Sequence, residues 1–542
     1  MPVVTLYLKR LEKLVGAKAS RIVDALPFLG LDIEEQTQEY IRVEYSPNRP
    51  DYATDVGVAS GLQGLLGIRT GLAKFSVKKS KLYSIKVDSA TKKIRPCISG
   101  LVAKGGTLDD ESIRQLIALQ EDLHFGVGRR RKKASIGIHN LDAVSFPLLY
   151  TVKPKDHKFV PLAANTEMSV QQILENTDVG RAYGKVLGEG HKVPMILDAS
   201  GNTVSFPPII NSSLTTVSTS NTDLLVEVTG NDQSAVDDSL AVVASALHNL
   251  GFTIYDVVIN SKSTSSAFAT RIMGLDSDLV NQTLGLHMTP QSICTSLKKC
   301  RLDAKARGKK ITCTIPRFRF DILGPMDLVE EAALGYGIKN LGPTLPASAS
   351  VGQKNPTTLR LDSISQVMVG LGFTEALNSG LTSKQTLYNN CKRDSTDMIE
   401  VAESKSQEHT ILRDMILPGL LENLSRNVHE SYPQKLFETG TVFSKGEPIK
   451  ESISIACVSA HKDAGYTEIK SALQSLLKTD SNIECKTKTA VNPMFAAGKM
   501  ADVVINGKKV GVVGEIDPTV AENFKMRVPI SGFEIVLSDS VL

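Results

Sequence analysis

The sequence lacks the features that mark several large classes of protein. Its seven cysteines are odd in number, and none forms a Cys-x-x-Cys pair with histidines nearby. That argues against a disulfide framework and against structural zinc, and it fits a reducing cytoplasm. No apolar run is long enough to span a bilayer, and charged residues interrupt residues 1–15, so neither a membrane span nor a signal peptide is expected. We therefore expect a soluble, cytoplasmic protein without a membrane partner.

The sequence also has little net charge for its length. A formal charge of +4 over 542 residues does not by itself indicate a polyanionic partner. One basic run stands out, Arg129-Arg130-Arg131-Lys132-Lys133, although such short runs are more often solvated faces than phosphate contacts. Hydrophobic residues make up 42% and charged residues 22%, the balance of an ordinary globular protein. The length predicts about three or four domains.

The order of the patterns predicts a multidomain α+β protein. Residues 1–82 read as a mixed α/β domain, with a rigid turn at residues 46–51 before a closely packed helix. Residues 83–265 alternate β-rich runs with helices, as at residues 97–103, 111–123 and 232–250, and predict a second mixed α/β domain. Gly251 is the predicted C-terminal cap of the last of these helices.

Two further domains are predicted. Residues 270–346 contain two short helices within 279–302, a strand at 311–315 and a helix ending at Gly335, which favours a winged-helix-like module. Residues 347–542 open with a helix that carries Leu361, Ile364 and Leu371. Strand-like runs follow at residues 435–443, 452–459 and 501–516, and indicate an antiparallel sheet flanked by helices.

The sharpest local motif carries four carboxylates, those of Asp321, Asp327, Glu330 and Glu331. Asp327, Glu330 and Glu331 are spaced i, i+3 and i+4, on one face of a helix that Pro325 opens. Without a soft ligand among them, such a set suits Mg²⁺ better than Zn²⁺. Acidic residues at a helix N-terminus also complement its dipole, and the spacing leaves both interpretations open.

Several motifs together resemble the β subunit of phenylalanyl-tRNA synthetases of the archaeal or eukaryotic type. The family pattern is similar to Asp321-Ile322, Asp327 to Glu331 and Tyr336-Gly337 here, and the resemblance implies that the four acids bind Mg²⁺. Three more strings resemble family signatures in the right order, with Asn140 and Asp517 replacing the usual Asp and His: Ser46 to Asp51, Ser135 to Asp142 and Gly514 to Pro518. The resemblance covers essentially the whole chain.

Residues 347–542 resemble a class II synthetase core that has lost its ATP machinery. The strand that bears an arginine in that class corresponds to Lys435-Leu436-Phe437-Glu438, which places Leu436 where the arginine belongs. No arginine follows Glu534 in the last matching strand, although adenylyl transfer needs fixed cations. The resemblance therefore implies an α₂β₂ assembly in which a separate α subunit supports ATP-dependent charging of tRNA(Phe) with phenylalanine.

The resemblance also implies that residues 83–265 edit mischarged Tyr-tRNA(Phe). An apolar pocket rejects an added hydroxyl only about a hundredfold, so hydrolysis at a second site is needed. We assign Glu227 to accept the tyrosine hydroxyl, and Thr229, Ser205 and Asn211 to hold the substrate backbone and the attacking water. Ordinary strand and loop residues are the competing interpretation for all four, and His139 is more simply a structural residue than a base. A nucleic-acid-binding scaffold and a free-standing editing hydrolase remain alternative functions.

Overall fold

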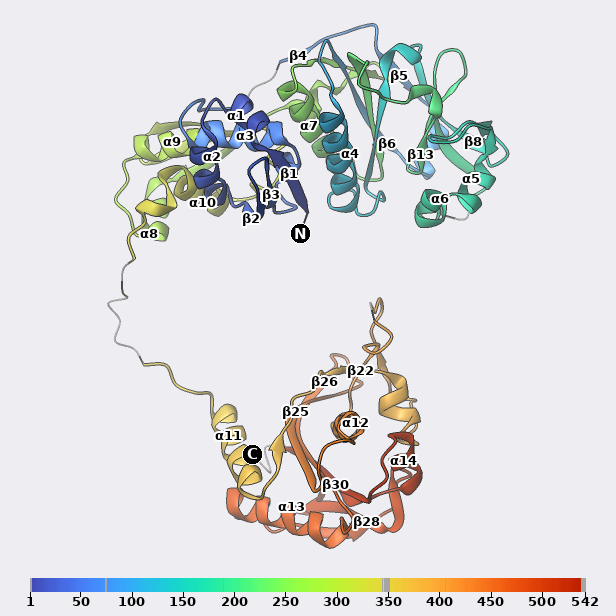
Figure 1. Ribbon diagram of the computed structural model, residues 1–542, viewed down its shortest axis with the longest axis vertical. Helices are drawn as coiled ribbons and strands as arrows, with labels where there is room; N and C mark the ends of the chain where they lie inside the picture. The colour runs from blue at the N-terminus through green and yellow to red at the C-terminus, as the bar shows by residue number, and fades with distance from the viewer. Residues whose placement is uncertain are drawn as a thin grey trace. The chain divides into compact units, whose positions relative to one another are not determined.

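The computed structural model describes residues 2–73, 76–188, 190–343, 345, 351–404 and 406–537. The chain forms two compact units, residues 1–345 and 346–542, each with its own core (Figure 1). The predicted boundary at residues 346–347 lies outside the described residues, and the division of the first unit into three domains stays a prediction. Among the helices that the structure describes, none combines the length and apolar character needed to cross a membrane.

The first unit begins with a small sheet covered by helices. The strands are ordered β1-β3-β2. The elements are β1 (Val3–Tyr7), α1 (Leu8–Val15), α2 (Ala19–Ala25), β2 (Asp32–Gln36), β3 (Tyr40–Glu44) and α3 (Asp55–Leu65). The predicted close packing of α3 is confirmed: a Cβ atom at Gly57 would lie 1.7 Å from the Asp51 carbonyl oxygen, and one at Gly64 would lie 2.2 Å from that of Lys299. These contacts leave no room for a larger residue at either position.

Two sheets packed face to face follow. One has the order β4-β15-β6-β14-β7 and includes β4 (Val77–Lys78) and β15 (Thr253–Asp256). The other has the order β13-β12-β11-β8-β5-β16-β17 and includes β11 (Lys192–Leu197), β8 (Leu148–Pro154), β5 (Ser84–Val87), β16 (Val258–Ile259) and β17 (Lys262–Ser263). Alternate residues of β14 (Asp223–Gly230) face opposite ways: Val226 and Val228 pack toward helices, while Leu225 packs toward the second sheet. These helices, α4 (Asp110–Phe125) and α7 (Gln233–Asn249), lie on the same side of the first sheet (Figure 1). The remaining strands that matter for the site are β6 (Cys97–Lys104), β7 (Ala134–Asn140), β12 (Thr203–Phe206) and β13 (Ile210–Asn211).

The last part of the first unit is a three-stranded sheet with three helices. The strands are ordered β18-β20-β19. The elements are β18 (Arg271–Asp276), α8 (Ser277–Leu284), α9 (Pro290–Lys299), β19 (Asp303–Arg307), β20 (Lys310–Ile315) and α10 (Pro325–Tyr336). Helix α8 ends at Gly285, whose φ of 66° suits a glycine, and Thr289 caps α9 ahead of Pro290. The two predicted helices, the strand and the final helix are present, whereas β18 and β19 were not predicted.

The second unit is a seven-stranded sheet with helices on both faces. Its order is β21-β25-β26-β30-β29-β28-β27, antiparallel except for the short edge strand β21 (Thr374–Glu375). In β26 (Lys450–Ala460), Ile455 and Cys457 share a core with α13 (Tyr466–Ser481), while Ala456 and Val458 share one with α12 (Leu417–Arg426). The predicted strand at 501–516 is two strands, β28 (Phe495–Ile505) and β29 (Lys508–Ile516), separated by a turn at Asn506-Gly507. Strands β25 (Gln434–Ser444) and β30 (Ile530–Leu537) lie beside β26, and β27 (Lys486–Thr489) pairs with β28 at the other edge.

Candidate functional site

A cavity of about 410 Å³ lies in the first unit, where two sheet edges meet. Strand β7 is an edge of one sheet and β13 an edge of the other. The amide of Asn211 in β13 donates to the Ile138 carbonyl oxygen in β7 at 3.4 Å, which joins these edges. Most of the lining side chains are apolar, among them Ile113, Leu116, Ile117, Ile136 and Ile209. A concave, mostly apolar cavity with a few polar groups is the usual form of a small-molecule site.

Glu227 is the more deeply buried of two carboxylates, Glu121 and Glu227, that line this cavity. It lies in β14 opposite Gly100 of β6 and Gly137 of β7, and its side chain is only 2% exposed. The Ser205 hydroxyl donates to Glu227 Oε1 at 2.9 Å, whereas Oε2 has no hydrogen-bond partner within the described part of the chain. A buried polar atom without a partner costs free energy, so Oε2 is an acceptor whose hydrogen-bonding capacity is unused.

Gly137 makes room for Glu227. A Cβ atom at this position would lie 2.5 Å from Glu227 Oε1 and 2.6 Å from His139 Nε2. His139 itself is fully buried and does not line the cavity: its Nδ1 contacts the Thr215 hydroxyl at 2.8 Å, and its Nε2 lies 3.9 Å from Glu227 Oε1. The histidine therefore lies next to the carboxylate without a hydrogen bond to it, and it does not line the space that a substrate would fill.

The predicted pocket residues divide into two groups. Ser205, Asn211 and Glu227 line the cavity, and their roles in a common site stay a prediction. Thr229 does not line it: its hydroxyl accepts from Arg95 Nε at 2.9 Å and lies 3.2 Å from the Ser135 hydroxyl. The side chain of Arg95 is almost completely buried, and burial lowers its pKa to about 10. Thr229 thus belongs to a supporting network around Arg95, which lies behind the cavity wall and not on it.

Arg131 closes one side of the cavity. Its Nη1 donates to the carbonyl oxygens of Pro208 and Ile209 at 3.2 and 2.9 Å, and its Nη2 donates to Glu121 at 2.8 Å. Glu121 also lies 3.2 Å from His124 Nδ1. Because Arg131, Glu121 and His124 all line the cavity, they are functional candidates that the motif analysis missed.

The four predicted Mg²⁺ ligands are not gathered around one point. Arg319 donates to Asp321 at 2.8 and 2.9 Å and to Glu331 Oε1 at 2.5 Å, and although burial opposes it, this guanidinium lowers the pKa of Asp321. Asp327 instead accepts the backbone N–H groups of Leu323 and Gly324 at 2.7 Å and caps α10, while Glu330 is exposed. Within the described residues, no group of three His, Cys, Asp or Glu side chains could hold a metal. This arrangement therefore does not fit a four-carboxylate Mg²⁺ site.

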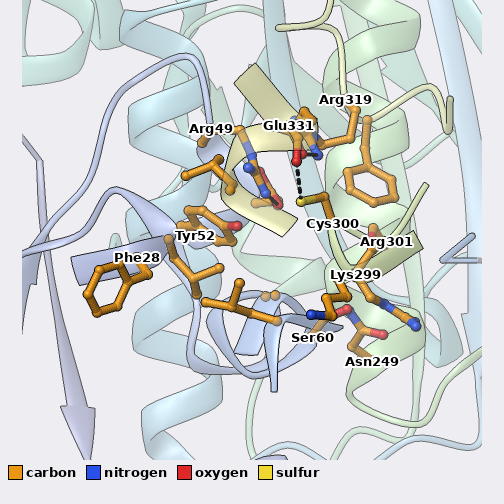
Figure 2. A pocket seen from close by; sticks show the side chains of 18 residues that line it. Phe28, Arg49, Tyr52, Ser60, Asn249, Lys299, Cys300, Arg301, Arg319 and Glu331 are labelled. Atoms are coloured by element: carbon orange, nitrogen blue, oxygen red, sulfur yellow. Dashed lines mark hydrogen bonds and ion pairs between the residues drawn. The ribbon is translucent and has the colours of Figure 1, made fainter. Parts of the chain in front are cut away.

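The family signature at residues 46–51 lies next to the acidic motif around a small cavity (Figure 2). Arg49 forms a bidentate pair with Asp51 at 2.8 and 2.9 Å and lies 3.9 Å from the Tyr52 ring centroid. Arg49, Tyr52, Arg319 and Glu331 line one small cavity of about 30 Å³. The Cys300 thiol donates to the Glu331 carbonyl oxygen at 3.1 Å. The two segments are distant in sequence and line the same cavity, although each arginine pairs with a carboxylate of its own segment.

In the second unit, the two strand glutamates are engaged in structural contacts. Glu438 in β25 is fully buried and accepts from Arg413 at 2.6 Å and Asn378 at 2.7 Å. Glu534 in β30 accepts the backbone N–H groups of Ile416 and Leu417 at the start of α12, and burial raises its pKa to about 7. Leu436 packs against an apolar core beside α12. Arg413 was missed by the motif analysis because it lies far from β25 in sequence.

Comparison with known proteins covers almost the whole chain. Residues 341–537 match the family described as the phenylalanyl tRNA synthetase beta chain CLM domain, and residues 273–338 match the tRNA synthetase B5 domain. The phenylalanine–tRNA ligase beta subunit of Archaeoglobus fulgidus is 39% identical over 544 residues, which are 99% of this chain and 98% of that protein. The chain belongs to the phenylalanine–tRNA ligase β-subunit family.

Further relatives agree with this membership. The beta subunit of Methanosarcina acetivorans is 37% identical over 547 residues, covering all of this chain and 99% of that protein. An N-terminal fragment of the phenylalanyl-tRNA synthetase beta subunit from Pyrococcus horikoshii superposes with a TM-score of 0.59 at 30% identity, covering 62% of this chain and all of the fragment. The family resemblance read from the motifs is thus confirmed, and the chain is a component of an aminoacyl-tRNA ligase that serves protein biosynthesis.

Proposed function

We propose that the cavity beside Glu227 hydrolyses Tyr-tRNA(Phe), and that the chain works in an α₂β₂ assembly in the cytoplasm whose α subunit performs the ATP-dependent charging of tRNA(Phe). The single observation that supports editing is Glu227, a carboxylate that lines a largely apolar cavity and whose Oε2 has no hydrogen-bond partner within the described residues. A phenylalanine ring offers this oxygen nothing, whereas the tyrosine hydroxyl can donate to it. A hydrogen bond to a charged acceptor contributes roughly 1.5–3 kcal/mol, or about ten- to a hundredfold in selectivity.

The remaining polar groups suit the hydrolysis of an ester by water. Water adds across the ester bond, which breaks to give free tyrosine and the terminal ribose hydroxyl of the tRNA. Ser205, already hydrogen-bonded to Glu227, and the side chain of Asn211 lie on the same cavity and are the groups we assign to hold the substrate backbone and that water. Thr229 acts one layer further back, by holding Arg95 and Ser135 in place.

Arg95 reaches the cavity only through its hydrogen bond to Ser135. Ser135 lines the cavity, and Arg95 Nη2 donates to its hydroxyl at 2.9 Å and to the Thr229 carbonyl oxygen at 2.6 Å. We therefore expect Thr229→Val to lower the rate of hydrolysis through a displaced wall, while the preference for tyrosine over phenylalanine stays unchanged. Loss of that preference in Thr229→Val would contradict the division of roles.

The side chains of the second unit indicate that it takes no catalytic part in charging. Leu436 stands where a class II enzyme has an arginine, and the neighbouring Arg413 is occupied by Glu438 and by the Thr441 carbonyl oxygen. No fixed cation is thereby left on these strands to stabilise charge on an ATP phosphate, which adenylyl transfer requires. We infer that this degenerate class II core supports the α subunit, and that the module at residues 270–346 is winged-helix-like.

Mg²⁺ binding by Asp321, Asp327, Glu330 and Glu331 stays a prediction. It requires Asp321 and Glu331 to exchange their ion pairs with Arg319 for contacts with the ion. Glu330 separates the two possibilities, since it is exposed and lies outside the Arg319 network. If the ion binds, Mg²⁺ raises the Tm of the parent relative to EDTA, and Glu330→Ala loses that gain. An equal gain in parent and variant would leave the helix cap and Arg319 as the whole explanation of the motif.

The test of editing is deacylation of preformed Tyr-tRNA(Phe) by the complete complex. We expect the parent to hydrolyse it and Glu227→Ala to do so about ten- to a hundredfold more slowly in kcat/KM. Glu121→Gln is a useful second variant, because that carboxylate lines the same cavity but is already bound by Arg131. No hydrolysis by the parent would favour the alternative of a nucleic-acid-binding scaffold; full activity without the α subunit would favour a free-standing hydrolase.

A further inference from the structure

We propose that the turn at residues 129–132, which we call the basic turn, binds phosphates of the single-stranded 3′ end of tRNA as it enters the cavity. The inference rests on the proposed editing function, because it supplies the path by which an aminoacyl end reaches Glu227. The basic run at residues 129–133 has no role in the editing function as proposed so far. The turn joins the end of α4 to the start of β7, both of which line the cavity.

The backbone of the basic turn is unusual and firmly held. Arg129, Arg130 and Arg131 have φ values of 47°, 53° and 65°, a left-handed conformation that side chains other than glycine rarely adopt. Three such residues in succession persist only where their surroundings enforce the conformation. Here Arg131 N donates to the His124 carbonyl oxygen at 3.0 Å, and Lys133 N donates to that of Gly128 at 2.7 Å.

The side chains of the turn have two different roles. Arg131 is buried and fixes the turn to the cavity wall through Pro208, Ile209 and Glu121, and its guanidinium lies 4.2 Å from the Tyr183 ring centroid. Arg129, Arg130 and Lys132 are exposed. Lys133 is paired with Asp232 at 3.0 Å and is not counted as a phosphate ligand. A rigid anchor on the wall thus presents three cations beside the cavity.

An exposed aromatic ring accompanies these cations. Phe125, the last residue of α4, is 67% exposed, and the guanidinium of Arg130 lies 5.6 Å from its ring centroid. Cations that follow a phosphate backbone together with an aromatic surface for a base are the features that bind unpaired nucleotides. Cations after a helix C-terminus also offset the helix dipole, but that effect requires neither the exposed ring nor the strained turn.

The test compares two triple variants of the complete complex. Arg129→Gln/Arg130→Gln/Lys132→Gln removes the three exposed charges and keeps Arg131. Lys86→Gln/Lys92→Gln/Lys93→Gln is the matched control, since these exposed lysines belong to the same part of the unit and do not line the cavity. The probe is a short fluorescent single-stranded RNA ending in CCA, whose binding is followed by anisotropy over a range of salt concentrations.

We expect the basic-turn variant to bind the RNA about tenfold more weakly at low salt, and its plot of log K against log salt to be shallower by about 2, or about 0.7 for each lost phosphate contact. The control should match the parent. Undetectable binding by the parent, or equal affinity and salt dependence in parent and basic-turn variant, would overturn the proposal.

Deacylation separates this inference from the editing function itself. In the basic-turn variant, the Tyr-tRNA concentration at half-maximal rate should rise about tenfold while the rate at saturation stays that of the parent. Parent hydrolysis with an unchanged half-saturating concentration in the variant would refute the basic turn alone. Weakened RNA binding in a complex that hydrolyses nothing would uphold the basic turn and refute editing.

Discussion

Adding one methyl group at Gly137 should disable the cavity while leaving charging intact. The Cβ atom of Gly137→Ala would lie 2.5 Å from Glu227 Oε1 and 2.6 Å from His139 Nε2, closer than any stable contact. Both neighbours are almost completely buried, so relief requires the carboxylate to turn away from Ser205 and the cavity. Overpacking of this kind costs about 1–3 kcal/mol of stability. In addition, losing the hydrogen bond to a tyrosine hydroxyl would lower kcat/KM for deacylation by about ten- to a hundredfold.

Gly100→Ala is the matched control, because Gly100 faces Glu227 from the opposite strand. A Cβ atom there would meet the Val226 carbonyl oxygen at 3.1 Å and the Ile85 side chain at 3.6 Å, and none of its three nearest atoms belongs to Glu227. We expect both variants to lower Tm, and only Gly137→Ala to lose deacylation of Tyr-tRNA at temperatures where both are folded. Parent-like deacylation by Gly137→Ala, or equal losses in both variants, would refute the role assigned to Glu227.

Three further predictions concern charge and the second unit. Arg319→Met removes the cation that pairs with Asp321 and Glu331, so we expect the free energy of unfolding, measured in urea, to fall by about 3–5 kcal/mol. Because Arg319 holds the pKa of Asp321 low, this loss of stability should shrink below about pH 4, where the carboxyls take up protons. The pKa of Glu534 is about 7 in the folded chain and 4.5 when unperturbed, so the free energy of unfolding should fall by roughly 3 kcal/mol from pH 4.5 to 7, and Glu534→Gln should flatten this slope; a variant with the parental slope would contradict the assignment. The β chain alone should give no ATP–pyrophosphate exchange with phenylalanine, and exchange above background would show that Leu436 and the occupied Arg413 had been misjudged.

Much of the local structure was predictable because single residues encode it. Asp232 and Gly251 mark the two ends of α7: Asp232 accepts the N–H groups of Ser234 and Ala235, and Gly251 has a φ of 93°. Thr289 and Pro290 mark the start of α9 in the same way. Alternation along β14 also places Glu227 on the face opposite Val226, as expected for a strand.

What escaped prediction depends on partners distant in sequence. Thr229 shares a strand face with Glu227, but Arg95 from another segment holds it in the supporting network, and no spacing rule indicates that contact. The acidic motif was interpreted as a metal site or as a complement to the helix dipole. The cation that pairs with Asp321 is instead Arg319, which lies only two residues before it. The charge of residues 129–133 was visible, whereas their left-handed backbone, formed without any glycine, was not.

The most direct test of the central claim is ATP-dependent charging of tRNA(Phe) by the α–β complex with tyrosine in place of phenylalanine. If Glu227 recognises the tyrosine hydroxyl at a hydrolytic site, the parent complex accumulates no Tyr-tRNA, whereas Glu227→Ala accumulates it while its charging with phenylalanine stays at the parental rate. Absence of Tyr-tRNA from both complexes, with tyrosine still activated by the α subunit, would mean that the cavity beside Glu227 is not the editing site.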